Sequence, residues 1–227
     1  MFKPLPIVVF LLFFGTLKAQ NKFDYFIYGA PLVTHLTNLR VDGDGVVGKL
    51  GFEGGLGTIV QLSNGRHWRF AIAFAERGAR KRRLFDPSSD ALNIENVDFH
   101  LRLRYITLPL LYCFPSHGLN IQTGVSTNFL MDDQQITSDN LPPQNLDFRG
   151  VDFMVHFNLE FEVTKKMYFS VNLYHSINTI NKVDANVGWW FQRGSMHRGL
   201  GVGLTYYFDE PKFQIEEKVE DKKEYDF

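Results

Sequence analysis

The stretch Val151-Asp152-Phe153-Met154-Val155-His156-Phe157-Asn158-Leu159-Glu160-Phe161-Glu162-Val163 alternates between two kinds of side chain. Every odd-numbered position holds Val, Phe or Leu, whereas the even-numbered positions hold Asp, Met, His, Asn and Glu. Successive side chains of a β-strand point to opposite faces, so a period of two predicts a strand. One face of this strand suits lipid, and the other suits water or charge.

Seven further segments show a similar alternation, and the connections between the eight segments are alternately short and long. Short periplasmic turns and long outer loops are typical of bacterial outer-membrane barrels. The pattern therefore predicts an all-β fold, namely an eight-stranded antiparallel up-and-down transmembrane β-barrel. The predicted strands are residues 23–35, 50–63, 67–79, 98–113, 119–131, 151–163, 167–179 and 197–208.

The period alone does not say which face is inside, so a secreted lipocalin-like barrel with an apolar lumen is the alternative. The positions of lysine argue against it, because a water-facing exterior would carry many lysines. The ten lysines after residue 20 all lie at predicted strand edges, in connections or near the C-terminus. We therefore expect the apolar face to meet lipid.

The two ends of the chain differ from the barrel in composition. Residues 1–20 combine Lys3, an apolar run and the small Ala19, as secretory signal peptides do. Residues 21–208 form the predicted barrel. Residues 209–227 hold eight acidic residues and four lysines, and we expect a disordered, charged periplasmic tail. These features predict location in the cell outer membrane, with both termini in the periplasm.

Charged residues on the polar faces predict a network inside the lumen. An arginine facing lipid near the middle of the bilayer would cost about 2–4 kcal/mol, so the arginines should point inward. An eight-stranded barrel has room only for side chains, which favours a charged plug over an ion pathway. The predicted lumen network is Glu53, Arg69, Arg77, His100, Arg102, Arg104, Asp152, His156, Glu160 and Glu162.

A basic cluster of Arg80, Lys81, Arg82 and Arg83 follows the third predicted strand. It is a candidate site for lipopolysaccharide phosphates, because arginine binds phosphate through two parallel hydrogen bonds. The equally weighted interpretation is a charged rim that marks the end of the membrane span. Near the middle of the next strand, Pro109 lacks an N–H group and predicts a local bulge.

Catalytic and metal-binding patterns are absent from the sequence. His175 and Ser176 are adjacent, so a strand sends them to opposite faces, where they cannot act together. The seven histidines show no paired metal-ligand spacing on one face. We expect no enzyme activity, no metal and no cofactor, and the balanced charge argues against nucleic acid as a partner.

Four stretches resemble one known family. Tyr105-Ile106-Thr107-Leu108-Pro109-Leu110-Leu111 is similar to the Tyr-Leu-Glu-Ile-Pro-Leu-Leu signature of the PorT-like outer-membrane β-barrel family of Bacteroidetes, although Thr107 stands where that family often has an acid. Segments 75–80, 151–166 and 201–208 resemble its third, sixth and closing strands. The resemblance implies an outer-membrane barrel. One branch of the family takes part in type IX protein secretion and gliding.

The sequence thus predicts a non-enzymatic outer-membrane barrel with a structural or interaction role. Its expected partners are outer-membrane lipid and lipopolysaccharide, and a periplasmic or secretion-system protein. Two alternatives remain open: a component of a type IX secretion and gliding apparatus, and a narrow porin-like channel.

Overall fold

The computed structural model describes residues 23–37, 46–62, 65–81, 99–116, 118–136, 147–180 and 195–211. No helix in these ranges is long and apolar enough to cross a membrane. The strands are β1 (Phe23–Thr37), β2 (Val46–Val47), β3 (Lys49–Gln61), β4 (His67–Lys81), β5 (Phe99–Ser116), β6 (Leu119–Ile136), β7 (Val151–Thr164), β8 (Met167–Ser176) and β9 (Met196–Tyr207).

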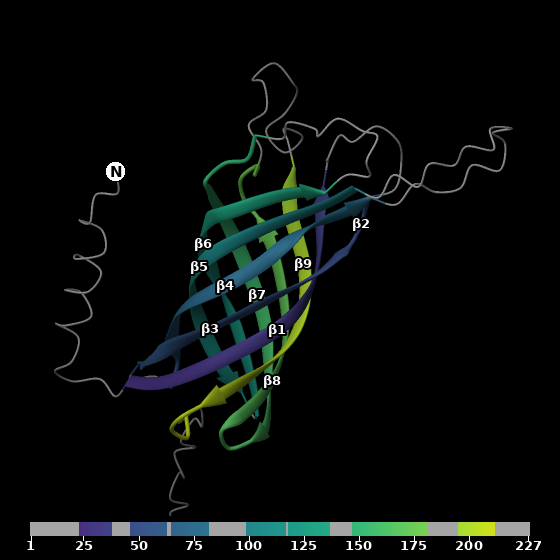
Figure 1. Ribbon diagram of the computed structural model, residues 1–227. Coiled ribbons are helices and arrows are strands. Elements are labelled where there is room, and N and C mark those ends of the chain that lie inside the picture. Colours follow the sequence, from purple (N-terminus) through teal and green to yellow (C-terminus); the bar gives the residue numbers. More distant parts are fainter. Residues whose placement is uncertain are drawn as a thin grey trace, which may run out of the picture.

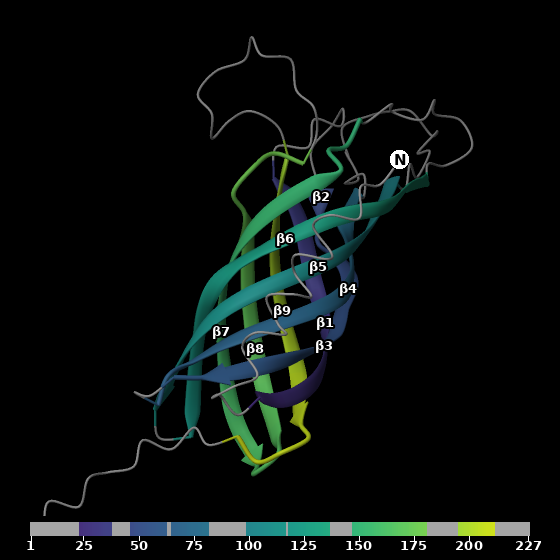
Figure 2. The ribbon, with the colours of Figure 1, turned by 90° about the vertical axis from the view of Figure 1, so that its left-hand side faces the viewer.

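The eight long strands close into a barrel (Figures 1 and 2). Each pairs antiparallel with the next long strand along the chain, and β9 pairs with β1 to complete the circle. The short β2 is an addition that pairs with the end of β4 at Arg80 and Lys81. The predicted eight-stranded antiparallel up-and-down barrel is confirmed.

Three short connections lie at one end of the barrel, which we call the turn end; the opposite end is the loop end. Gly65 and Gly118 have φ angles of 77° and 78°, in the left-handed region that glycine enters without steric cost. The barrel also starts and finishes at the turn end, where the backbone N–H of Phe208 donates to the Tyr25 carbonyl at 3.0 Å. Both ends of the described barrel therefore lie beside the short turns.

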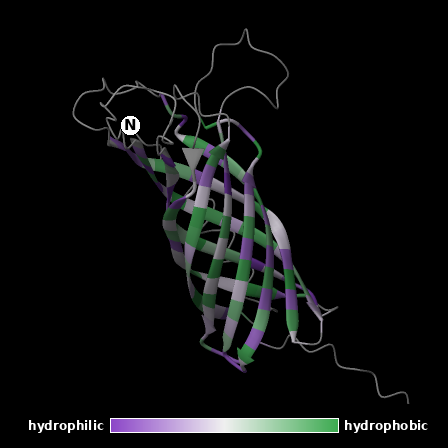
Figure 3. Ribbon diagram, turned by 90° about the vertical axis from the view of Figure 1, so that its right-hand side faces the viewer, coloured by the Kyte–Doolittle hydropathy of each residue, from purple (hydrophilic) through white to green (hydrophobic). Residues whose placement is uncertain are grey.

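The alternation predicted for residues 151–163 is present in β7. Asp152, His156 and Glu160 are buried inside the barrel, whereas Phe153 and Phe157 are 48% and 45% exposed on its exterior. Figure 3 shows the same alternation of hydrophobic and hydrophilic residues along the ribbon of other strands. Large exposed apolar side chains occur on all eight long strands, so the exterior is an apolar surface.

The predicted bulge at Pro109 is wrong. The β4–β5 ladder is interrupted opposite Pro109 and resumes in the same register on either side. The proline lacks the N–H for a ladder hydrogen bond, and the pairing is lost there without insertion of an extra residue. The register of β5 with β6 shifts elsewhere, between Arg104 and Tyr105.

Candidate functional site

The lumen contains two arginines from β4, Arg69 and Arg77. They are eight residues apart, so the period of two places both on the inner face of the strand. Each forms an ion pair with a glutamate from another strand. Arg69 pairs with Glu160 of β7, and Arg77 pairs with Glu53 of β3. These ion pairs organise two polar layers, which we call the turn-side layer and the loop-side layer.

The turn-side layer is built on Arg69 and Glu160. Their atoms Nη1 and Oε1 are 2.9 Å apart, and the two side chains are 7% and 0% exposed. The guanidinium also lies 4.0 Å from the ring centroid of Phe26, within range of a cation–π interaction. The second carboxylate oxygen of Glu160 accepts hydrogen bonds from three side chains, those of Asn120, Gln122 and Tyr207. Because both charges are paired and hydrogen-bonded, the cost of burying them is offset.

The loop-side layer is built on Arg77 and Glu53. Arg77 Nη2 donates to Glu53 Oε2 at 2.7 Å, and the Tyr28 hydroxyl donates to Oε1 of the same carboxylate at 2.9 Å. Nη1 of Arg77 donates to Asn128 Oδ1 at 3.2 Å. The guanidinium also lies 4.9 Å from the ring centroid of Tyr174. Four strands therefore contribute to holding one buried arginine.

A small cavity lies between the two layers, with a volume of about 30 Å³. Its lining includes Glu53 from one layer and Arg69 from the other, and His156 beside them. A single water needs roughly 10–15 Å³ of such space, so the cavity has room for about two waters. It is too small for a solute of metabolite size.

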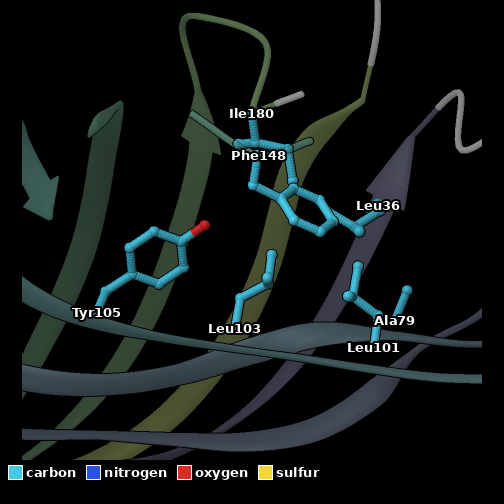
Figure 4. Close-up of a cluster of buried hydrophobic side chains, with 7 residues drawn as sticks. All are labelled: Leu36, Ala79, Leu101, Leu103, Tyr105, Phe148 and Ile180. Carbon is cyan, nitrogen blue, oxygen red and sulfur yellow. The ribbon is translucent and has the colours of Figure 1, made fainter. Parts of the chain in front are cut away.

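Apolar side chains fill the lumen beyond the loop-side layer (Figure 4). Leu101, Leu103 and Tyr105 extend from β5, and Phe148 and Ile180 reach over them from the segments before β7 and after β8. We call this group, with Leu36 and Ala79, the apolar cap. It is nearly free of solvent contact, since its most exposed member, Phe148, is only 8% exposed.

A second apolar group fills the lumen toward the turn end. Phe26, Ile59, Ala71, Tyr168 and Tyr207 pack there, and the Tyr168 and Tyr207 rings meet edge to face with centroids 5.2 Å apart. The Tyr207 hydroxyl also belongs to the turn-side layer. The lumen is thus filled at four levels by the described side chains: the apolar cap, two polar layers and this aromatic group.

Two further residues predicted for the lumen network, Asp152 and His156 of β7, lie near the loop-side layer. Asp152 accepts a hydrogen bond from the Ser176 hydroxyl at 3.1 Å. His156 Nε2 lies 2.7 Å from the Ser126 hydroxyl of β6, a contact that sequence spacing did not suggest. A Ser–His contact can activate a nucleophile, but both side chains are buried and the neighbouring cavity has no room for a substrate. The pair therefore links β6 and β7 inside the lumen.

Three residues assigned to the lumen network point outward instead. His100, Arg102 and Arg104 alternate with the buried residues of the apolar cap on β5, and they lie on the outer face. Arg102 Nε lies 3.2 Å from Glu76 Oε1, and Arg104 Nη1 lies 3.0 Å from Asp132 Oδ2. β5 has 18 residues, more than the roughly 9–11 that a tilted strand needs to cross a membrane, so a span need not include Arg102 and Arg104 near its loop end. The cost of an arginine that faces lipid near mid-bilayer is therefore no guide to the orientation of these residues.

The structure describes Glu162, but only part of the basic cluster. Glu162 lies on the inward side of β7, but near the turn end, where it is exposed. Arg80 is exposed at the loop end of β4. The side chain of Lys81 and all of Arg82 and Arg83 lie outside the described residues, as do residues 1–22 and 212–227.

Metal ligands do not gather in the part of the chain that the structure describes, where no group of three or more His, Cys, Asp or Glu side chains could hold an ion. The sole cysteine, Cys113, is buried on the inner face of β5. The described side chains of the lumen interact through ion pairs, hydrogen bonds and apolar packing.

No protein-family model matches the chain, and no curated protein matches it either. Among solved structures, it is similar to Neisserial surface protein A, with 12% identity, 80% of this chain and 96% of that chain covered, and a TM-score of 0.47. It is also similar to OprG from Pseudomonas aeruginosa (12% identity, 82% and 96% covered, TM-score 0.41) and to the attachment invasion locus protein Ail of Yersinia pestis (12%, 83% and 99%, TM-score 0.38). At these identities the likeness is one of fold.

Proposed function

We propose that the chain is an outer-membrane β-barrel protein with a structural or interaction role, whose lumen is closed by its own side chains. The observation that carries this proposal is the inverted polarity of the barrel: apolar side chains cover the outside, and ion pairs lie inside. Soluble monomers rarely expose apolar patches larger than a few hundred Å². A closed barrel also leaves no unpaired strand edge, which a membrane requires.

The proposal includes an orientation. The short turns and both ends of the barrel lie together at the turn end, and outer-membrane barrels keep their short turns in the periplasm. The turn end then faces the periplasm with both termini, and the loop end faces outward.

Epitope tags test location and orientation together. The full chain is expressed in a Gram-negative host with one tag inserted between residues 82 and 98 and, separately, one after residue 227. We expect the protein in the outer-membrane fraction after an alkaline wash. The inserted tag should bind antibody on intact cells, and the terminal tag only after permeabilisation. Recovery in the soluble periplasm, or the reverse labelling, would contradict the proposal.

We further propose membership of the PorT-like family, on the residues 105–111 and the three stretches that accompany them. A role in type IX secretion rests on that resemblance alone. A gene deletion in the host separates the secretion role from the structural or interaction role. The measurement is the export of proteins that carry a type IX signal. Lost export would indicate a secretion component, whereas unchanged export leaves the structural or interaction role.

The interaction role requires a partner, and the predicted periplasmic tail is the first segment to test. Affinity capture after crosslinking in intact outer membranes compares the full chain with one that ends at residue 208. A partner recovered only with the full chain would bind residues 209–227.

The basic cluster at Arg80–Arg83 is proposed to bind lipopolysaccharide phosphates. Arg80 is exposed at the loop end, as this proposal requires.

A further inference from the structure

Three polar side chains form a row on the outer surface near the loop end. In the strand register, His35 of β1 lies opposite Arg198 of β9, which lies opposite His175 of β8. The neighbouring residues Thr34 and Ser176 are buried inside, so the row faces outward. Arg198 is exposed.

An apolar row runs directly beneath it, two residues closer to the middle of the barrel. Val33, Leu200, Leu173 and Phe157 lie opposite one another in turn, on β1, β9, β8 and β7. The two rows line an open groove of about 620 Å³. The groove therefore has an apolar floor and a polar head that contains Arg198.

Hydrogen bonds hold the guanidinium of Arg198 at the head of the groove. His175 Nδ1 lies 2.5 Å from the Ser176 carbonyl oxygen, so this nitrogen carries the proton and donates. Nε2 is then the acceptor, and Arg198 Nε donates to it at 2.9 Å. His175 is therefore a positioning residue that uses only one N–H of the arginine.

The rest of the guanidinium is left for another partner. Among the described residues, no carboxylate lies within ion-pair distance of Arg198. The outward arginines of β5 differ, because Arg102 contacts Glu76 and Arg104 contacts both Glu76 and Asp132. The two Nη groups of Arg198 have no hydrogen-bond partner among the described residues. Such a guanidinium matches two oxygens of a phosphate, and Lys could not replace this bidentate contact.

We propose that this groove binds a lipid with a phosphate monoester headgroup of the lipid A type. The phosphate contacts Arg198, and one acyl chain lies along Val33, Leu173 and Leu200. The charge of the head and the apolar floor each match one part of such a lipid. The inference rests on the proposed function, because the loop end must face the leaflet that holds this lipid.

Native mass spectrometry of the full chain in detergent tests the site. Lipid A is titrated against the unaltered protein, Arg198→Gln and Arg66→Gln, the last being a matched loss of charge in a short turn at the opposite end. Loss of a charge-assisted contact should weaken binding about tenfold or more in Arg198→Gln. Arg66→Gln should bind as the unaltered protein does. Arg198→Lys should be intermediate, since it keeps the charge without the bidentate geometry.

Two further arms identify the ligand. Lipid A without its phosphates should bind the unaltered protein and Arg198→Gln equally weakly. Inorganic phosphate should compete poorly, because it lacks the acyl chain; full competition would indicate a free-anion site and overturn the proposal. Equal lipid A binding by Arg198→Gln and the unaltered protein would also overturn it, as would equal losses in both glutamine variants. Failure of the proposed function is a separate result, because the epitope tags would then locate the protein outside the outer membrane.

Discussion

Each buried arginine in the lumen donates to one carboxylate and also to neutral acceptors, which include Gln122 and Thr205 for Arg69 and Asn128 for Arg77. Arg69 and Glu160 come from strands on different sides of the barrel, and their contact is almost free of solvent. In such a pair, the penalty for removing one partner is larger than the net stabilisation by the pair, because the remaining charge stays buried. The pairs therefore make the barrel sensitive to single substitutions and tolerant of paired ones.

Arg69→Met leaves the Glu160 carboxylate buried without its cation, and we expect it to lower the free energy of unfolding by about 3–5 kcal/mol. The double variant Arg69→Met/Glu160→Gln should recover most of this loss. Urea titration of the protein in lipid vesicles measures both values.

Arg102→Met is the matched control, because Arg102 pairs with Glu76 on the partly exposed outer face. Such a pair contributes about 1 kcal/mol or less. A double variant no more stable than Arg69→Met would show that the buried charge is not the cause of the loss.

At Gly78 the backbone has a φ angle of 154°, which side-chain-bearing residues rarely adopt. A Cβ there would lie 2.0 Å from the Leu101 carbonyl oxygen. Gly78→Ala should therefore destabilise the barrel by about 1–3 kcal/mol in the same urea titration. Gly29→Ala is the control, since a Cβ at Gly29 meets no atom within 4 Å, and it should change stability by less than about 0.5 kcal/mol. Equal effects would argue against the steric explanation.

At the level of strands, the sequence predicted position better than orientation. The predicted segment 151–163 differs from β7 by one residue, because its alternation is unbroken and its faces differ strongly. In β5 both faces carry apolar residues, so the alternation alone did not orient it. The cost of arginine in lipid then gave the wrong face. That rule assumes a position near mid-bilayer, whereas β5 is longer than a span requires and Arg102 and Arg104 lie near its loop end.

For the candidate site, the sequence predicted which face of a strand holds each residue but not which residues contact one another. Period two placed Glu53, Arg69, Arg77 and Glu160 on inner faces, but which arginine meets which glutamate depends on the strand register around the closed barrel. The contribution of Phe148 and Ile180 to the apolar cap could not be read from periodicity, because both lie outside the long strands.

The orientation of β5 is testable by substituting two adjacent residues, one on each face of the strand. Leu103→Arg would place an unpaired charge in the apolar cap, and we expect it to lower the free energy of unfolding by more than about 3 kcal/mol or to prevent folding. Arg104→Leu removes only a partly exposed ion pair and should cost about 1 kcal/mol or less. Circular dichroism and urea titration in vesicles compare the two. The opposite order would mean that Arg104 faces the lumen.

At the scale of the whole molecule, the filled levels of the lumen form successive barriers along the barrel axis. An ion that crosses the barrel must pass the apolar cap, the loop-side layer, the 30 Å³ cavity, the turn-side layer and the aromatic group. Opening one level leaves the others closed. The proposed interaction role is therefore carried by the outer surface and the connections, and the narrow channel is the alternative that conductance can separate from it.

In planar bilayers the purified full chain should give no discrete conductance steps, whereas an open porin reconstituted in the same way should. Phe148→Ala removes the one aromatic ring of the apolar cap that comes from outside the long strands. This variant should also give no conductance steps, because the Arg77–Glu53 and Arg69–Glu160 layers beneath the cap are unchanged. Steps in Phe148→Ala alone would show that the cap is the only barrier and that the polar layers conduct. Reproducible steps in the unaltered protein would contradict the closed lumen and favour the channel.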